Sequence, residues 1–466
     1  MEVDLSVAGN PLSIPPETLF EMAARVNKKR GFLFVSKVLG KHIPVSPLKP
    51  LLASGLLAIE YAERTFGLMT DIKAEVIKGF LAEDHESMKK ACDLLEKQRL
   101  ALPVSPIVIG FAETATALGH GVYDSIEGAS FIHTTRETLK DADPVLTFEE
   151  EHSHAVDQLC YTDEPIFSAA ERPVILVDDE LTTGKTALNI IRDIQKKHPR
   201  REYAVLSLLD WRSSEHKEEF RKAEAELGVT ISTSALLSGA VAYQGKTLDQ
   251  SSYDDRPRGD EEDVSVRWID LSDCFTALPH LSEQTGDAPF VKETGRFGLA
   301  AGDKRGVEAA CQKAAERLNA LRKGKRVLCL GTGEFMYLPM KIASLMGEHV
   351  FYHSTTRSPI HPSGEEGYAV KNGFGFPNPE NETVKHFIYN LPKRGYDEVF
   401  VFIEKSVAAR SLLPMFRIFS DRQINDVTVV TFSKGSDRHG SCCCGNGQLS
   451  RVGCDVSFKR PVRHFD

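Results

Sequence analysis

The stretch VILVDDELTTGKT, residues 174–186, joins an apolar run to two adjacent acids and then to a short segment of threonine, glycine and lysine. Carboxylates accept hydrogen bonds from sugar hydroxyls, whereas loop amides, threonine hydroxyls and a helix N-terminus bind phosphate. The following ALNIIRDIQKK, from Ala187, has apolar residues at helical spacing. The pattern predicts a strand, a loop and a helix around a sugar phosphate, with Asp178 and Asp179 on the sugar.

Two other interpretations of this stretch compete with a sugar-phosphate site. A nucleotide P-loop needs a glycine five residues ahead of its Gly-Lys, and Asp179 stands there, where its charge would repel a polyphosphate. An ordinary acidic cap on a βα unit would explain one acid and one threonine, but not the whole run. The sugar phosphate remains the favoured ligand.

The composition limits the classes of protein. The chain has 466 residues, 41% hydrophobic and 26% charged, which suits two or three domains. It has no apolar run of about 18 residues and no signal-peptide pattern, so we expect a cytoplasmic protein without a membrane partner. A net charge of −9 argues against a nucleic-acid partner.

The nine cysteines are irregularly spaced and favour reduced thiols over a disulfide framework. A zinc site in the CCC region around Cys442–Cys444 is conceivable, but its spacing fits no common pattern. Its candidate ligands are His439, Cys442, Cys444 and Cys454.

The stretch resembles the 5-phosphoribosyl-1-pyrophosphate (PRPP) signature of type I phosphoribosyltransferases: four apolar residues, two acids, three residues, then Thr-Gly-x-Thr. The resemblance implies that Asp178 and Asp179 bind the ribose 2′- and 3′-hydroxyls. It implies that the 5′-phosphate is bound by Thr182, Thr183, Gly184, Lys185 and Thr186. It also implies small-molecule substrates, Mg²⁺ on the diphosphate, release of pyrophosphate, and a homodimer as one option for assembly.

Other parts of the same implied site precede this signature. The turn after the strand at 107–110 would bind pyrophosphate; it contains Phe111, Ala112, Glu113, Thr114 and Ala115. After the next strand, Arg136 and Lys140 match the family's Arg-x-x-x-Lys, where cations would stabilise the departing pyrophosphate. Solvated surface residues are the alternative for this pair.

Three further segments could complete the site. The long polar segment 141–159 predicts a lid or a disordered loop, and its His152 and His154 either assist pyrophosphate release or are surface histidines. A strand end bearing Asp210, Trp211 and Arg212 is where the family places its acceptor base; a core tryptophan beside an ion pair is equally consistent. Lys37, Lys41 and His42 belong to an N-terminal segment predicted to form a hood.

The C-terminal half repeats the first half. VIGFAET resembles CLGTGEF, and IHTTRE resembles HSTTRS; Arg357 minus Arg136 and Gly331 minus Gly110 both give 221. At the position of the two aspartates the second copy has Phe402 and Ile403, so we expect no PRPP binding there. Its arginine predicts a surviving anion site at Arg357 and Ser358.

This half also resembles the TRSP domain, named for the Thr-Arg-Ser-Pro that begins at Thr356. That domain is known behind an orotate-phosphoribosyltransferase-like domain in tellurite-resistance-associated stress-response gene clusters, which implies a role in making a nucleoside-like metabolite. We therefore predict an α/β protein of two doubly wound parallel-sheet domains, the first with a hood and the second a degenerate copy. The expected boundaries are 1–245, a connector at 246–306, and 307–466.

The functional prediction is a Mg²⁺-dependent transferase that moves phosphoribosyl from PRPP to a base-like acceptor. Positioning and charge stabilisation would supply the rate, because the reaction needs no protein nucleophile. The alternative is a PRPP-binding regulatory or scaffold protein without turnover.

Overall fold

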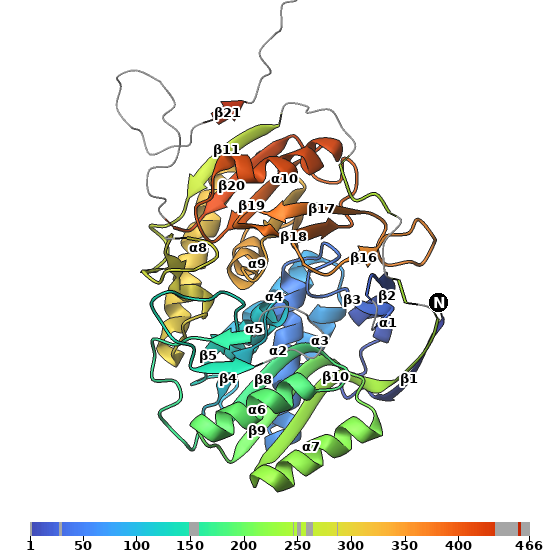
Figure 1. The fold of residues 1–466 in the computed structure, drawn as a ribbon, viewed down its shortest axis with the longest axis vertical. Coiled ribbons are helices and arrows are strands. Elements are labelled where there is room, and N and C mark those ends of the chain that lie inside the picture. The colour runs from blue at the N-terminus through green and yellow to red at the C-terminus, as the bar shows by residue number, and fades with distance from the viewer. Residues whose placement is uncertain are drawn as a thin grey trace, which may run out of the picture.

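The computed structural model describes residues 2–27, 30–148, 158–245, 247–248, 253–257, 264–286, 288–433 and 455–457. His152, His154 and the CCC region with its candidate zinc ligands lie outside these ranges. The described chain forms two α/β domains, one above the other in Figure 1. This arrangement confirms the predicted class of two parallel-sheet domains.

The first sheet has the strand order β1-β10-β9-β8-β4-β5, and all pairs except β1 with β10 are parallel. Its central strands are buried on both faces, which explains their continuous apolar runs. Its strands are β1 (Glu2–Gly9), β4 (Ile107–Gly110), β5 (Ser130–His133), β8 (Val174–Leu181), β9 (Glu202–Asp210) and β10 (Thr230–Gln244).

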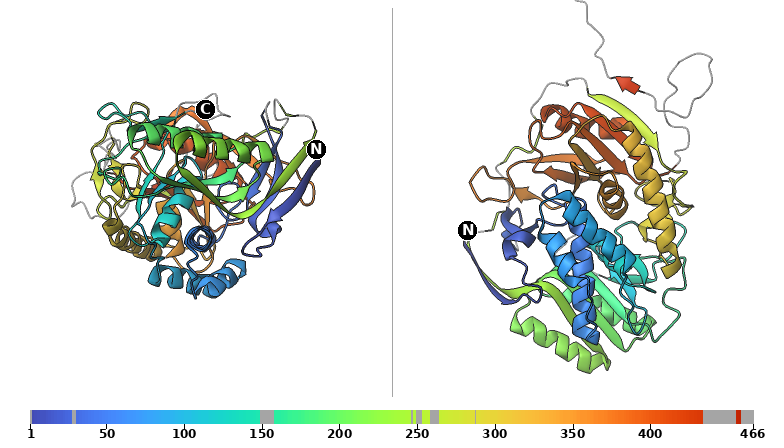
Figure 2. Two further views of the ribbon diagram at one scale, coloured as in Figure 1. Left: turned by 90° about the horizontal axis from the view of Figure 1, so that it is seen from below. Right: turned by 180° about the vertical axis from the view of Figure 1, so that it is seen from behind.

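Helices cover both faces of this sheet, as a doubly wound fold requires (Figures 1 and 2). The amphipathic α6 and α7 lie on one face, while the long, almost entirely buried α2 packs with α5 on the other. The helices are α2 (Leu48–Phe66), α3 (Lys73–Leu81), α4 (His85–Lys97), α5 (Ala115–Ser125), α6 (Lys185–Lys197) and α7 (Ser214–Leu227).

The predicted hood is a small antiparallel sheet at the junction of the two domains. The short α1 (Pro16–Leu19) leads into β2 (Phe20–Arg25), which pairs with β3 (Phe32–Ser36). The other edge of β2 pairs with β16 (Ile360–His361), directly after the Thr-Arg-Ser-Pro sequence. The C-terminal domain therefore contributes a strand to the hood of the first domain.

The second sheet has the order β15-β14-β19-β20-β11-β21. Its first five strands are parallel and occupy the same places as β5-β4-β8-β9-β10 in the first sheet. Helix α10 lies on one face and α8 on the other (Figure 2). The strands are β11 (Ser265–Asp270), β14 (Val327–Gly331), β15 (Val350–Ser354), β19 (Glu398–Ile403), β20 (Asp426–Thr431) and the antiparallel β21 (Asp455–Ser457). The helices are α8 (Lys304–Leu321), α9 (Tyr337–Ser344) and α10 (Ala409–Asp421).

The segment predicted as a connector holds more structure than a linker. Its β11 is the fifth strand of the second sheet, and its later part forms β12 (Ala277–Leu278), β13 (Phe290–Val291) and two short 3₁₀ turns, Lys292–Thr294 and Ala301–Asp303. Turn-rich, charged sequence concealed the strand, because β11 is short and has a single buried position, so it shows neither an apolar run nor a regular alternation.

Two hairpins follow the equivalent strands β5 and β15. The first pairs β6 (Leu146–Phe148) with β7 (Gln158–Cys160), within the segment predicted as a lid, and the second pairs β17 (Gly373–Asn378) with β18 (Asn381–Tyr389). Within the part of the chain that the structure describes, no helix combines the length and the apolar character needed to cross a bilayer.

Candidate active site

A cleft of about 380 Å³ opens at the carboxyl ends of β4, β5 and β8, where ligands bind in open parallel sheets. The hood forms one wall and the Thr-Arg-Ser-Pro turn another. It is lined by Arg25, Arg30, Leu33, Phe34, Lys41, His42, Phe111, Ala112, Glu113, Thr114, Arg136, Asp178, Asp179, Glu180, Leu181, Thr182, Thr183, Gly184, Thr186, Ala187, Arg357, Ser358 and Pro359.

The two predicted aspartates lie in this cleft. Strand β8 continues through Leu181, so Asp178 and Asp179 lie within its last four residues. Both are half-buried and line the cleft. The Asp178 Oδ1 atom accepts a hydrogen bond of 2.9 Å from the Asp179 amide, which fixes the first carboxylate against its own backbone. Both aspartates therefore border the space that is open to a ligand.

The loop after β8 delivers its backbone to the start of α6. Gly184 caps the helix in the left-handed region at φ 76°, a conformation that glycine adopts without cost. A Cβ atom there would lie 2.5 Å from the Phe220 ring and 3.2 Å from Arg212 Cδ. Thr182, Thr183, Gly184 and Thr186 line the cleft; Lys185 begins α6 and is not among the lining residues.

The predicted pyrophosphate turn borders the same cleft through Phe111, Ala112, Glu113 and Thr114. Ala115 instead begins α5 and is buried. The Ala112 amide donates to Thr134 Oγ1 at 2.7 Å, and the Gln158 side chain donates to the Ala112 carbonyl at 2.8 Å. These contacts hold the turn, whose Ala112–Glu113 peptide bond is cis.

Glu113 carries a negative charge inside the cleft. Burial alone would raise the pKa of its carboxyl, but Lys41 and the more distant His386, Arg357 and Arg136 outweigh burial and lower it. Lys41 Nζ lies 3.6 Å from Glu113 Oε2 and also hydrogen-bonds Thr114 Oγ1. The hood lysine therefore lines the same cleft as Glu113.

The two residues of the Arg-x-x-x-Lys motif lie in different surroundings. Arg136 lines the cleft, whereas Lys140 is exposed, lies outside the lining residues, and donates its amide to the Leu281 carbonyl at 2.9 Å. The chain turns away from the cleft between the two residues. A spacing of four residues outside a helix does not hold two side chains on one side.

The three residues predicted to bind the acceptor do not line this cleft. Asp210 and Arg212 are buried and pair with each other through bonds of 2.9 and 2.7 Å, beside a separate hollow. Trp211 is 6% exposed and stacks behind Phe34, with ring centroids 5.1 Å apart. The earlier alternative, a core tryptophan beside an ion pair, describes them better, and Arg212 supports the turn at Gly184 from behind.

The hood supplies cleft residues that the sequence did not single out. The Arg30 guanidinium donates to Glu180 Oε1 at 2.6 Å, and burial raises the pKa of Glu180 despite this arginine. Phe34 presents an aromatic ring, and Arg25 a further cation, to the same wall. Lys37 is not among the residues that line the cleft and pairs with Glu21 at 3.1 Å.

His42 lines the cleft as a neutral imidazole. It is 5% exposed, and burial, followed by Lys41 and other nearby cations, lowers its pKa well below the usual value. Within the described chain, neither of its buried ring nitrogens has a hydrogen-bond partner. Such a group is equipped to accept or donate one hydrogen bond to a ligand.

The predicted C-terminal anion site is not separate from this cleft. Arg357, Ser358 and Pro359 line it, and Arg357 Nε lies 3.7 Å from Glu113 Oε1. The Val26 amide donates to the Pro359 carbonyl at 3.0 Å, which joins this turn to the hood. The second half of the chain therefore forms part of the first domain's site.

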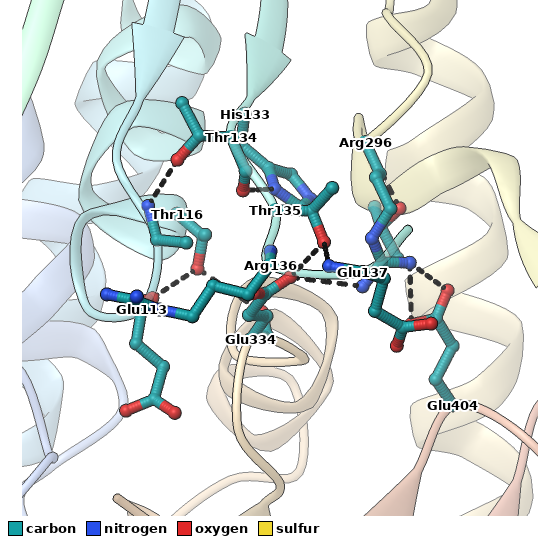
Figure 3. A network of polar contacts seen from close by, with 12 residues as sticks. Glu113, Thr116, His133, Thr134, Thr135, Arg136, Glu137, Arg296, Glu334 and Glu404 are labelled. Carbon is teal, nitrogen blue, oxygen red and sulfur yellow. Dashed lines mark hydrogen bonds and ion pairs between the residues drawn. The ribbon is translucent and has the colours of Figure 1, made fainter. Parts of the chain in front are cut away.

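A residue of the second domain also contacts the arginine turn of the first domain (Figure 3). Glu334, which follows β14, accepts hydrogen bonds of 2.6 Å from Thr135 Oγ1 and 2.9 Å from the Arg136 amide. Its own backbone carbonyl accepts from Thr116 Oγ1 at 3.2 Å. A carboxylate of the second domain thus positions the arginine turn of the first.

Comparison with known proteins agrees with this architecture. Residues 19–240 match PRTase_2, described as a phosphoribosyl transferase, and residues 293–419 match the TRSP domain, described as C-terminal to PRTase_2. A comparison with curated proteins finds no significant match.

Solved structures similar to the chain include adenine phosphoribosyltransferases. That of Trypanosoma brucei, in complex with AMP, pyrophosphate and ribose-5-phosphate, has 14% identity over 48% of this chain and 79% of its own, with a TM-score of 0.29. The Leishmania donovani structure gives 14% identity, 49% and 80% coverage and a TM-score of 0.27. The Giardia lamblia structure, complexed with 9-deazaadenine, gives 19% identity, 32% and 78% coverage and a TM-score of 0.21.

The first domain has the doubly wound α/β fold predicted for it, with its cleft at the carboxyl edge of the sheet. The chain belongs to the family in which a PRTase_2 phosphoribosyl transferase domain is followed by a TRSP domain. This confirms the family predicted from the two motifs.

Proposed function

We propose that the protein transfers the 5-phosphoribosyl group of PRPP to a base-like acceptor and releases pyrophosphate. The supporting observation is the convergence, in one cleft, of Asp178 and Asp179, the loop from Thr182 to Thr186, and the cations Lys41, Arg136 and Arg357. Hydroxyl acceptors, a phosphate-binding turn and cations for a leaving group are the parts that this reaction needs.

Each part has a distinct task in the proposed reaction. The two aspartates orient the ribose by accepting from its hydroxyls, and the α6 N-terminus holds the 5′-phosphate. As the bond between C1′ and the diphosphate breaks, negative charge grows on the leaving group, and Arg136 stabilises it. The acceptor nitrogen then bonds to C1′ and its proton leaves, so no protein nucleophile takes part.

Mg²⁺ fits this cleft as a companion of the diphosphate. Carboxylate and hydroxyl oxygens are its preferred ligands, and Glu113, Asp178 and Asp179 all line the cleft. When bound, the ion neutralises part of the diphosphate charge. Among the described residues, no group of three or more side chains is arranged to hold a metal ion by itself.

We assign the acceptor to the hood wall. Phe34 and Leu33 offer an apolar face for a planar ring, while His42 offers ring nitrogens with no partner in the described chain. This assignment replaces the acceptor role first given to Asp210, Trp211 and Arg212. The cytoplasmic location and the stress-response setting of tellurite-resistance gene clusters remain part of the proposal on the basis of the sequence resemblance.

The test is pyrophosphate release from PRPP and Mg²⁺ with a panel of purines, pyrimidines and small amines. Asp179→Asn should bring release to background, because the amide removes one acceptor for the ribose hydroxyls; the matched control is Asp71→Asn, at an exposed position outside the cleft. Calorimetry with PRPP separates the alternatives. Binding without release for any acceptor would favour a PRPP-binding regulatory protein, and no binding at all would end the proposal.

A further inference from the structure

The sequence repeat becomes a two-way exchange of contacts in three dimensions. Glu113 and Glu334 are equivalent residues, 221 positions apart, and so are Arg136 and Arg357. Glu113 faces Arg357 of the second domain, and Glu334 binds the turn at Arg136 of the first. Each half therefore places its glutamate against the Thr-Thr-Arg turn of the other.

The repeat extends into the hood and into the segment predicted as a connector. The Ser354 amide donates to the Gly40 carbonyl at 2.8 Å, and its counterpart, the His133 amide, donates to the Gly295 carbonyl at 3.3 Å. Both glycines have positive φ angles, 71° and 83°. The cation after each glycine meets the glutamate of its own half: Lys41 lies 3.6 Å from Glu113, and Arg296 lies 3.7 Å from Glu334.

The two equivalent sites differ in what occupies them. In the second, Glu404 holds the Arg296 guanidinium through two bonds of 2.8 Å, and Lys405 pairs with Glu137 at 3.0 Å (Figure 3 shows the first of these). The Lys405 ammonium also lies 3.4 Å from the centre of the Phe290 ring. Apart from the partly exposed Glu137, these side chains are buried, and together they fill the place that the open cleft leaves for a ligand.

The open cleft has neutral residues at the positions of the filling pair. The counterpart of Glu137 is Ser358, 221 positions on, and the counterpart of Lys405 is Leu181, 224 positions back. Both line the cleft, and neither can form the ion pair that closes the other site. The sequence differences between the halves thus keep one site open and one filled.

The open site also retains a guanidinium with unused bonding capacity. Arg357 is 36% exposed along its side chain, and its contact with Glu113 at 3.7 Å is too long for a hydrogen bond. Within the described residues, its buried Nε atom has no hydrogen-bond partner. A guanidinium can donate parallel N–H bonds to two oxygens of a phosphate or a carboxylate. The Glu113 contact at 3.7 Å does not use this geometry, so the capacity remains for a diphosphate.

We propose that the Thr-Arg-Ser-Pro turn is the second half of the PRPP site, with Arg357 and Ser358 binding the diphosphate, and that the C-terminal domain has no sugar-diphosphate site of its own. This proposal rests on the proposed function of the cleft and adds that one chain, without a second copy, completes it. In the ligand-free protein Glu113 faces the arginine, and the diphosphate takes over that contact on binding.

The experiment is calorimetric titration of the full chain with PRPP and, separately, with inorganic pyrophosphate, both with Mg²⁺. Arg357→Ala should weaken both ligands roughly 10- to 100-fold, the range for losing hydrogen bonds to a charged group. Arg357→Lys keeps the charge without the paired N–H geometry and should recover only part of the affinity. The control is Arg410→Ala, which removes an exposed arginine from the first turn of α10 and should change neither titration.

The titrations test the role of the Thr-Arg-Ser-Pro turn separately from the proposed function of the cleft. Wild-type protein that binds one PRPP per chain, weakened by Arg357→Ala and not by Arg410→Ala, supports the proposal. Unchanged binding in a folded Arg357→Ala variant, or two PRPP per chain, overturns it while leaving the first-domain function intact. Thermal unfolding of each variant checks the fold, and wild-type protein that binds no PRPP refutes the proposed function itself.

Discussion

Replacing Gly184 by alanine tests the phosphate-binding turn through two separable costs. A left-handed conformation costs a residue with a Cβ about 1–2 kcal/mol. The added atom would lie 2.5 Å from Phe220 Cε2 and 2.7 Å from Cζ, and Phe220 is only 4% exposed. Forcing extra volume into such a packed position costs about 1–3 kcal/mol, so the free energy of unfolding should fall by about 2–5 kcal/mol.

Gly228→Ala is the matched control for this variant. Gly228 follows α7 with φ 65°, close to the 76° of Gly184, but an added Cβ would meet no atom within 4 Å. It should lose only the conformational cost of about 1–2 kcal/mol. Urea unfolding measures both, and PRPP titration should show weaker binding for Gly184→Ala alone. Equal losses of stability with unchanged PRPP binding in both variants would refute the role assigned to this turn.

Two further predictions concern the charge and the wall of the cleft. The lowered pKa of Glu113 means that its ion pairs stabilise the folded state above the ordinary value near 4.5 and are lost as the pH falls through the lowered value. The difference in unfolding free energy between wild type and Glu113→Gln should therefore be largest at neutral pH and vanish in acid; a difference that stays constant would contradict the assignment. Trp211 stacks on Phe34, which lines the cleft, so in a Trp268→Phe background its fluorescence should change when an acceptor binds the hood wall. A signal that no acceptor able to promote pyrophosphate release can alter would place the acceptor elsewhere.

The sequence predicted those parts of the site that depend on local chain geometry. Two aspartates and a Thr-Thr-Gly loop at the end of one strand stay together whatever the rest of the chain does. The class of fold followed from the resemblance of the two motifs to known families and from the repeat of the first half in the second. The repeat indicated a second domain of the same class, but it did not predict β11, which lies in the segment expected to be a connector.

The errors came from contacts that local patterns do not encode. Asp210 and Arg212 pair with each other in the interior, and which partner a charged side chain finds depends on the packing of α7 against the sheet. Lys140 lies beyond a turn that carries it away from Arg136. Arg30 and Phe34 sit in a hood with no recognisable motif, so nothing in their spacing marked them as cleft residues.

The most informative misjudgement concerned Arg357. The sequence assigned it to an anion site of the C-terminal copy, because that copy keeps the arginine after two threonines although it lacks the paired aspartates. Its actual position follows from the pairing of β16 with β2, a contact between segments separated by more than 300 residues. The repeat alone shows that the two halves are alike; it does not show that each half contacts the Thr-Thr-Arg turn of the other.

The place of β11 in the chain has a practical consequence for dividing the molecule. This strand pairs with β20 yet precedes α8 in sequence, so a fragment of residues 307–466 would begin after one of its own strands. The amide and carbonyl groups of β20 that β11 satisfies would then lie bare along a hydrophobic edge, which invites aggregation. Any excised fragment should start ahead of Val264, and insolubility of the shorter piece would say nothing about its biological role.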